Sequence, residues 1–254
     1  MNLFKKLTGK IFAFWALLVF ILTMFLVLLP IIIIGLWPEP KRSHLFHPIT
    51  EFWMKIFFTL SGVRRVFKGR ENIKKNETYI IVCNHRSFLD PPLSTPSIPY
   101  PNKTIAKIEM AKIPLFGIVY KRGSVLVNRK SEESRKQSYA KMKEVLAMGL
   151  HMCIYPEGTR NRTTEPLQKF HDGAFKLAVE TGKKIIPSLL FNTSNIFPAK
   201  GIFFWPGKVE MHFLPAVDVA NKNTQELKEE VFEIMKNYYL NSFSTSVERA
   251  GVRY

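Results

Sequence analysis

The chain has 254 residues, enough for one sizeable domain, and carries 37 Lys and Arg against 20 Asp and Glu, a formal net charge of +17. The basic excess is uneven, because residues 1–70 hold 10 basic and 2 acidic side chains and residues 102–143 hold 11 and 3. Such patches attract anionic lipid, nucleic acid or phosphate-bearing substrates. The two cysteines, Cys83 and Cys153, lie far apart in apolar runs, and no HExxH, clustered Cys/His or EF-hand pattern occurs, so we expect reduced core cysteines, no metal and no cofactor.

The first predicted element is an uncharged apolar segment from Ile11 to Trp37. It exceeds the roughly 20 residues that cross a hydrocarbon core and the roughly 7–15 residues of a signal-peptide core. No small-residue cleavage site follows it, so we predict a membrane-anchoring helix over 11–37 that stays in the mature protein. Basic residues flank it on both sides, so the positive-inside rule favours neither orientation. Pro30 lacks a backbone donor and could break the helix, so a straight span and a bent or re-entrant segment both stay open.

A second helix is predicted over 46–62, where apolar residues recur at helical spacing and two arginines follow. The apolar residues are Ile49, Phe52, Trp53, Ile56, Phe57 and Leu60. This periodicity is the same for a helix in a membrane interface and for one packed on a domain core. The neighbouring anchor favours the interface. We therefore predict an N-terminal membrane anchor over 1–66 ahead of a globular domain over 67–254.

Beyond residue 70, short strand patterns alternate with helical stretches. Strands are predicted at 78–83, 123–127, 151–155, 184–190 and 208–213, and helices at 131–149, 173–181 and 224–239. Such alternation is typical of an α/β domain. The predicted fold class is a central β-sheet covered by helices and preceded by a membrane-anchoring helical region.

The stretch "CNHRSFLD" places His85 directly after a strand and Asp90 five residues on. The two side chains can meet only if the chain turns between them, because residues five apart on a regular helix point in different directions. If they pair, the carboxylate fixes the histidine tautomer and leaves the other ring nitrogen free to accept a proton, as in general-base catalysis. The alternative is a turn in which Asn84 and Asp90 bond only to the backbone.

Two further blocks carry basic residues at strand ends. "KIEMAKIPLFGIVYKRGSVLVNRK" contains Lys107 and Arg129, and "YPEGTRN" places Glu157 and Arg160 in a tight turn after a strand. Guanidinium groups presented in this way can bind a phosphate with paired, charge-assisted hydrogen bonds. Each block alone also fits an ordinary turn with a solvated arginine.

Taken in order, these blocks resemble the 1-acylglycerol-3-phosphate acyltransferases and their glycerolipid acyltransferase relatives. The resemblance covers roughly residues 45–215. It rests on six blocks in the family's order: "NHRSFLD", "KIPLFG", "GSVLVNR", "YPEGTRN", "FHDGAF" and the "IIP" of "KIIPSLL". It implies that residues 67–254 form an acyltransferase catalytic domain that acts at a membrane.

By this resemblance, His85 is the general base that deprotonates the free hydroxyl of a lysophospholipid, and Asp90 orients it. The hydroxyl then attacks the thioester of an acyl carrier protein or coenzyme A donor directly. The substrate-binding residues implied are Lys107, Arg129, Glu157, Gly158, Thr159 and Arg160, with the three basic side chains on the acceptor phosphate. The expected acceptor is 1-acylglycerol-3-phosphate, which gives phosphatidic acid. Both donors are cytoplasmic, so we expect a membrane-associated protein whose catalytic domain faces the cytoplasm.

Some positions depart from the commonest family pattern, namely Asn128, Tyr155, His171 and Ser188. His171 stands where lysine is frequent, which leaves open another acceptor such as a lyso-aminolipid. A hydrolase is disfavoured because no GxSxG elbow occurs and Ser87 is too close in sequence to its base. The remaining alternatives are a non-catalytic membrane-binding protein and, last, a nucleic-acid binder, for which no reader motif is present. We therefore expect no nucleic-acid partner.

Overall fold

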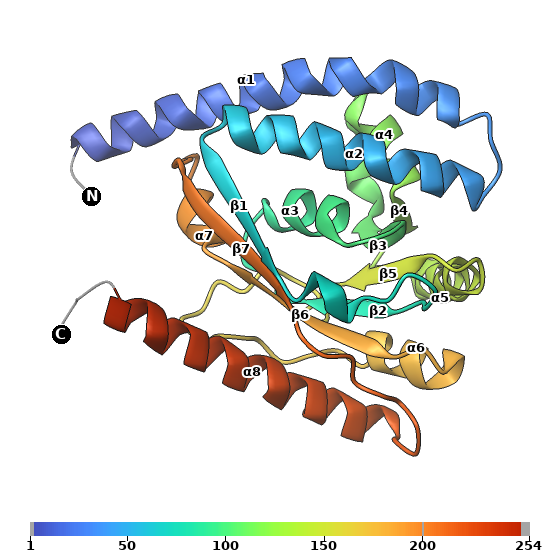
Figure 1. Cartoon of the computed structure of the whole chain (residues 1–254). Coiled ribbons are helices and arrows are strands. Elements are labelled where there is room, and N and C mark those ends of the chain that lie inside the picture. The colour runs from blue at the N-terminus through green and yellow to red at the C-terminus, as the bar shows by residue number, and fades with distance from the viewer. Residues whose placement is uncertain (1–2, 200, 250–254) are drawn as a thin grey trace.

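The computed structural model describes residues 3–199 and 201–249, which form one mixed sheet between two layers of helices (Figure 1). The strands are β1 (Val63–Lys68), β2 (Ile80–Cys83), β3 (Asn102–Lys107), β4 (Ser124–Val127), β5 (His151–Ile154), β6 (Ile185–Phe191) and β7 (Gly207–Phe213). The helices are α1 (Leu3–Ile34), α2 (Lys41–Leu60), α3 (Asp90–Ser97), α4 (Phe116–Arg122), α5 (Glu132–Ala147), α6 (Gly173–Thr181), α7 (Thr193–Ile196) and α8 (Thr224–Arg249), with short 3-10 turns η1 (Arg70–Asn72) and η2 (Ile108–Lys112).

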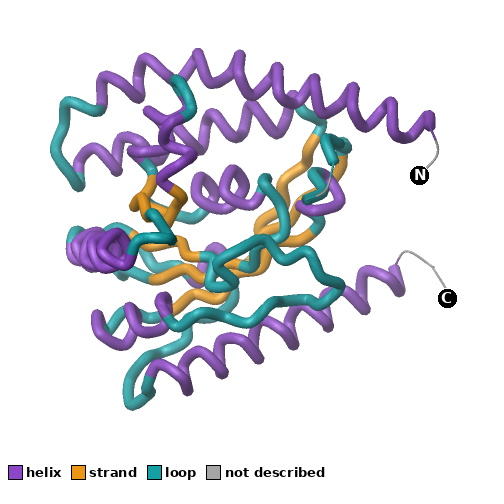
Figure 2. The backbone as a smooth tube through the Cα atoms, turned by 180° about the vertical axis from the view of Figure 1, so that it is seen from behind, coloured by secondary structure: helices purple, strands orange, loops and turns teal. Residues whose placement is uncertain are grey.

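The sheet has the strand order β1-β7-β6-β2-β5-β3-β4. Its pairs are parallel apart from β6 with β7, so β1 and β7 run against the other strands. Parallel strands covered on both faces are continuously apolar, and β2 is fully buried along its length. Its side chains alternate between two clusters: Ile81 and Cys83 face the α1–α2–α3 side, and Ile80 and Val82 face α5, α6 and α8. Figure 2 shows the same layers from behind.

The predicted α/β class is confirmed, and the predicted strands and helices correspond to β2, β4, β5, β6, β7, α5, α6 and α8. Two strands were missed. β1 carries two arginines in "VRRVFK" and β3 reads "NKTIAK", so neither has a clean apolar alternation. β3 fits the sheet because Lys103 is buried and its ammonium lies 2.7 Å from the Glu39 carboxylate. The predicted domain boundary at 66/67 falls inside β1, and the division into two domains stays a prediction.

The apolar N-terminal helix runs continuously through Pro30 to Ile34, so the helix does not break at that proline. By length and composition, the helix Phe4–Ile34 is suited to cross a membrane. One side of α1 lies along α2 (Figure 1), where the Trp53 Nε1–H donates to Thr23 Oγ1 at 3.0 Å. Its other side exposes large apolar residues: Phe4, Leu7, Ile11, Phe14, Leu17, Leu22, Phe25, Leu26 and Leu29.

The second predicted helix is α2, which begins earlier than expected and ends at Leu60. Trp53, Phe57 and Phe58 are buried in the same core cluster as the sheet, so this face is packed on the domain. Phe52 and Leu60 are more than half exposed. The periodicity left open a helix packed on the domain core and a helix in the membrane interface. The structure shows that one face of α2 packs on the core, and that an apolar edge of the same helix is exposed.

Candidate active site

The loop between β2 and α3 brings His85 and Asp90 together. β2 ends at Cys83 and α3 begins at Asp90, so the chain turns between the two residues as the pairing requires. Asn84 fixes the start of this turn, because its side chain donates to the Leu190 carbonyl at 3.1 Å and accepts from the Leu190 N–H at 2.7 Å. The loop is thus tied to the neighbouring strand β6 at the point where β2 ends.

The expected pairing is present: His85 Nδ1 lies 2.7 Å from Asp90 Oδ2. The same carboxylate oxygen accepts the backbone N–H groups of Arg86 at 2.6 Å and Ser87 at 2.7 Å, and Asp90 is fully buried. A carboxylate facing Nδ1 favours the tautomer with the proton on Nδ1, which leaves the Nε2 lone pair free. The His85 side chain is 19% exposed, whereas Asp90 is completely buried.

The His85 ring also packs against the ring of Tyr155. The ring of Tyr155 lies 4.5 Å from it between centroids, and the Tyr155 hydroxyl lies 2.6 Å from Ser94 Oγ on α3. Tyr155 follows β5 as His85 follows β2, and these strands are paired. Two neighbouring strand ends therefore supply the histidine and the aromatic ring that packs against it.

Glu157 is buried, and both of its carboxylate oxygens accept backbone hydrogen bonds. Oε1 accepts from the His85 N–H at 2.7 Å and Oε2 from the Gln168 N–H at 2.9 Å. Burial raises the pKa of this carboxyl to about 7, against the opposing effect of the two N–H groups. The Asn161 N–H donates to the His85 carbonyl at 2.6 Å. The turn after β5 therefore fixes the backbone of His85 by hydrogen bonds to both the N–H and the C=O of that residue.

Arginines surround this turn and differ in how their donors are used. Arg129 donates through Nη1 to the Gly158 carbonyl. Gly158 has φ +67°, so its backbone conformation favours glycine, and a Cβ there would also displace the His171 ring, which would lie 2.8 Å away. The Arg160 guanidinium stacks on the Phe88 ring at 3.5 Å, and burial lowers its pKa.

Contacts connect only some of the site residues that the sequence predicts. His85, Asp90 and Glu157 form one hydrogen-bonded unit, and Arg129 reaches it through Gly158. Lys107 ends β3 and Thr159 follows the β5 turn, and both are exposed. Residues that sequence reasoning did not assign to the site include Arg86, Phe88, Asn161 and Gln168. The only sequence feature that could have pointed to them is their position inside or next to the motif blocks.

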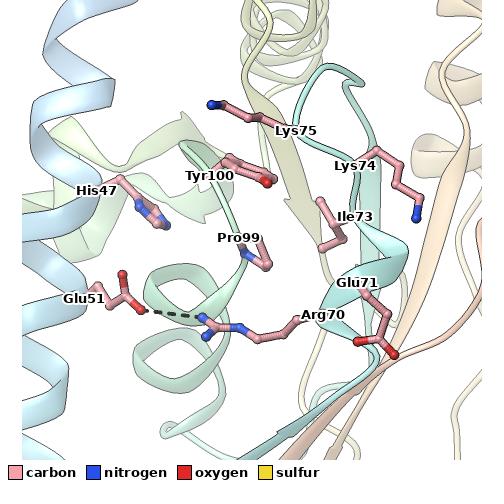
Figure 3. A pocket seen from close by; sticks show the side chains of 9 residues that line it. All are labelled: His47, Glu51, Arg70, Glu71, Ile73, Lys74, Lys75, Pro99 and Tyr100. Carbon is pink, nitrogen blue, oxygen red and sulfur yellow. Dashed lines mark hydrogen bonds and ion pairs between the residues drawn. The ribbon is translucent and has the colours of Figure 1, made fainter.

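A separate cavity of about 600 Å³ lies away from these residues. It is lined by His47, Glu51, Arg70, Glu71, Ile73, Lys74, Lys75, Pro99 and Tyr100 (Figure 3). Its lining residues precede β2 and β3, whereas His85 follows β2, so the cavity lies at the other end of these parallel strands. Arg70 and Glu51 form an ion pair of 3.5 Å within it. It is not part of the candidate active site.

Comparison with known proteins agrees with the motifs. A family model described as "Acyltransferase" matches residues 64–190. A 1-acyl-sn-glycerol-3-phosphate acyltransferase of Borreliella burgdorferi is 34% identical over 194 residues, which cover 76% of each chain. The chain belongs to the 1-acylglycerol-3-phosphate acyltransferase family. A Helicobacter pylori acyltransferase of the same name is 29% identical over 190 residues, covering 74% of this chain and 78% of its own.

The fold of this family member also matches a solved structure. The crystal structure of the 1-acyl-sn-glycerophosphate acyltransferase PlsC from Thermotoga maritima superposes with a TM-score of 0.80 over 98% of this chain and 99% of the other. The two are 24% identical, so this likeness concerns the fold. As a member of the family, the chain is an enzyme that transfers acyl groups, and the hydrolase and the non-catalytic protein considered from the sequence are set aside.

Proposed function

We propose that the enzyme acylates the free hydroxyl of 1-acylglycerol-3-phosphate with an acyl thioester, carried by acyl carrier protein or coenzyme A, and releases phosphatidic acid. The observation that carries this proposal is the 2.7 Å contact between His85 Nδ1 and the buried Asp90 carboxylate, with the ring partly exposed. That arrangement suits removal of a proton from an alcohol. The relatives named above act, by their names, on 1-acyl-sn-glycerol-3-phosphate.

The proposed chemistry is direct transfer. His85 Nε2 takes the hydroxyl proton while the oxygen attacks the thioester carbonyl, and Asp90 stabilises the imidazolium that forms. The tetrahedral intermediate then expels the thiolate, which takes the proton back from the imidazolium. The products are an ester and a free thiol, and no acyl group is attached to the protein.

We assign recognition of the acceptor phosphate to Arg160, Arg129 and Lys107. Arg160 is the strongest candidate, because its Nη1 is buried and has no hydrogen-bond partner among the described residues. A buried donor without a partner is costly, and a phosphate oxygen would satisfy it. Gly158 and Thr159 shape the backbone next to this group. Glu157 acts on the same pocket indirectly, by holding the His85 backbone.

The substrates are lipids, and the exposed apolar face of α1 suits association with a membrane. The opposite face of α1 is bonded to α2 through Trp53 and Thr23, so the proposed lipid contact lies along the domain. We place the catalytic domain on the cytoplasmic side, where both kinds of donor occur.

The test is mass-spectrometric product analysis of detergent-solubilised full-length protein, wild type and His85→Ala. Each is given 1-acylglycerol-3-phosphate or a lyso-aminolipid, with acyl carrier protein and coenzyme A thioesters in separate reactions. We expect phosphatidic acid from the wild type and a loss of about 10²- to 10⁴-fold in the variant.

The lyso-aminolipid reaction addresses His171, which stands where the family commonly has lysine and here packs against Gly158. Product from that acceptor alone would replace the proposed acceptor while leaving the chemistry intact. Phosphatidic acid formed equally by both proteins would contradict the role of His85.

A further inference from the structure

Phe88 is an exposed aromatic residue inside the catalytic loop. It lies between His85 and Asp90 and is 52% exposed, so one face of its ring is open to other groups. The Cζ atom of Arg160 lies 3.5 Å from the centre of its ring. This is close contact between a guanidinium and an aromatic face, the geometry of a cation–π interaction.

Arg86 belongs to this loop and Arg160 packs on it, and the two guanidinium groups use their donors in opposite ways. The Arg86 guanidinium donates to the backbone carbonyls of Thr163, Glu165 and Pro166, so it fastens one loop to another. Arg160 Nη1 is buried without a partner in the described part of the chain. The two arginines therefore differ in function: the hydrogen-bonding capacity of Arg86 is used by the fold, while that of Arg160 is still available.

An aromatic face has a specific advantage as the partner of a phosphate-binding arginine. It orients the guanidinium plane by contact with its face, so the N–H groups at the edge stay free to form paired bonds with an anion. A carboxylate in the same place would occupy those N–H groups and neutralise the charge that attracts the phosphate. An arginine without any partner would have to lose side-chain entropy when the ligand binds.

We propose that Phe88 is a positioning residue that holds the Arg160 guanidinium ready for the phosphate of the acceptor. This inference rests on the proposed function. Phe88 belongs to the same loop as His85 and Asp90, and the Asn161 N–H next to Arg160 bonds to the His85 carbonyl. The turn that carries Arg160 is therefore tied to the backbone of His85, so a phosphate bound by Arg160 would bring the free hydroxyl of the acceptor towards Nε2.

The test is steady-state kinetics with the full-length protein on 1-acylglycerol-3-phosphate and on monoacylglycerol, which lacks the phosphate. The variants are Phe88→Leu, Phe88→Tyr, Arg160→Ala and the double variant Phe88→Leu/Arg160→Ala. We expect Phe88→Leu to raise KM for the phosphate-bearing acceptor about 3- to 30-fold with kcat nearly unchanged. Phe88→Tyr keeps the aromatic face and should restore the wild-type KM.

Two controls separate positioning from a general loss of structure. In the Arg160→Ala background, Phe88→Leu should have no further effect on KM, because the group that it positions is gone. Arg162→Ala removes an equal charge from an exposed side chain that acts on Arg160 through its charge, so it should raise KM far less than Arg160→Ala does. Use of monoacylglycerol should be insensitive to Phe88→Leu.

The outcomes distinguish this proposal from the one on which it rests. An unchanged KM in Phe88→Leu, or the same rise in KM with and without Arg160, would overturn the role of Phe88 while the acyltransferase activity stands. A fall in kcat on both acceptors would also overturn it, since that result would place Phe88 in the support of His85. A wild-type protein that acylates no phosphate-bearing acceptor would overturn both proposals.

Discussion

Two histidines lie at opposite ends of the paired central strands β2 and β5, and their surroundings differ in every respect that matters for catalysis. His85 follows β2, is 19% exposed and has its Nδ1 against the Asp90 carboxylate. His151 begins β5 and is 2% exposed, and its Nδ1 accepts the Tyr79 N–H at 3.1 Å. Burial, with a smaller contribution from nearby His47, lowers the pKa of His151 to about 4.

The difference lies in the partner that faces Nδ1. A carboxylate at Nδ1 places the proton there, directs the Nε2 lone pair outward and stabilises the charged ring. A backbone N–H at Nδ1 requires the lone pair there instead, so the proton of His151 is on Nε2 and the ring stays neutral. One histidine is prepared to accept a proton, and the other is a hydrogen-bond acceptor for the fold.

The largest effect is expected from Asp90→Asn, which removes the negative charge that faces His85 and has no counterpart at His151. The amide oxygen can still accept from Arg86 and Ser87, and the amide nitrogen would occupy the position of Oδ1, which has no hydrogen-bond partner among the described residues. The amide N–H groups would have no acceptor there, so we expect a modest loss of stability with the fold retained. We expect kcat to fall about 10²- to 10⁴-fold, because the imidazolium loses its counter-charge.

The measurement is single-turnover acyl transfer, with the thermal midpoint recorded for both proteins. A large drop in the midpoint together with the drop in rate would mean that Asp90 serves mainly to cap the loop. Full activity in the variant would remove Asp90 from the mechanism.

The contact between His85 and Asp90 was predictable from the sequence because both residues lie in one short motif after a buried strand. The contacts around the pair were not, since they join residues distant in the chain: His85 with Glu157, and Phe88 with Arg160. The sequence also led us to assign Glu157 to substrate binding on the strength of its motif. Its burial and its two backbone partners depend on where the 155–168 loop folds, which no local pattern encodes.

The fold shows the same division between local and long-range information. Strands with continuous apolar runs, such as β2 and β6, were predicted to within two residues. β3 was not, because its buried Lys103 is accommodated by two partners distant in the chain: the Glu39 carboxylate in the α1–α2 connection and the Arg122 carbonyl at the end of α4. α3 was missed because "DPPLSTPS" contains three prolines, two of them in the first turn, where a missing N–H costs little.

A smaller effect is expected from Glu157→Gln, which tests whether the backbone of His85 must be held. The amide nitrogen would face one of the two N–H groups that the carboxylate accepts, so one hydrogen bond is lost. We expect kcat to fall about 10- to 100-fold through displacement of the base, with little change in KM for the acceptor.

Glu165→Gln is the matched control, because it makes the same chemical change at an exposed residue of the same loop. It should leave both parameters unchanged. A selective rise in KM in Glu157→Gln would instead return Glu157 to substrate binding, as the motif alone suggested.

The last prediction concerns stability and leaves the chemistry untouched. The pKa of His151 is about 4 in the folded protein, below the ordinary value of 6.5, so the folded state binds fewer protons than the unfolded state between these limits. Its contribution to stability is complete above pH 6.5 and is lost as the pH falls towards 4, by about 1.4 kcal/mol per pH unit at most.

His151→Asn keeps an acceptor near the Tyr79 N–H but does not titrate. Chemical denaturation from pH 7 to pH 4 should therefore show a shallower loss of stability in the variant, while kcat per folded molecule stays at the wild-type value. An equal loss of stability with pH in the two proteins would mean that folding does not lower the pKa of His151. A loss of kcat in the variant would contradict the conclusion that His151 serves the fold and takes no part in the chemistry.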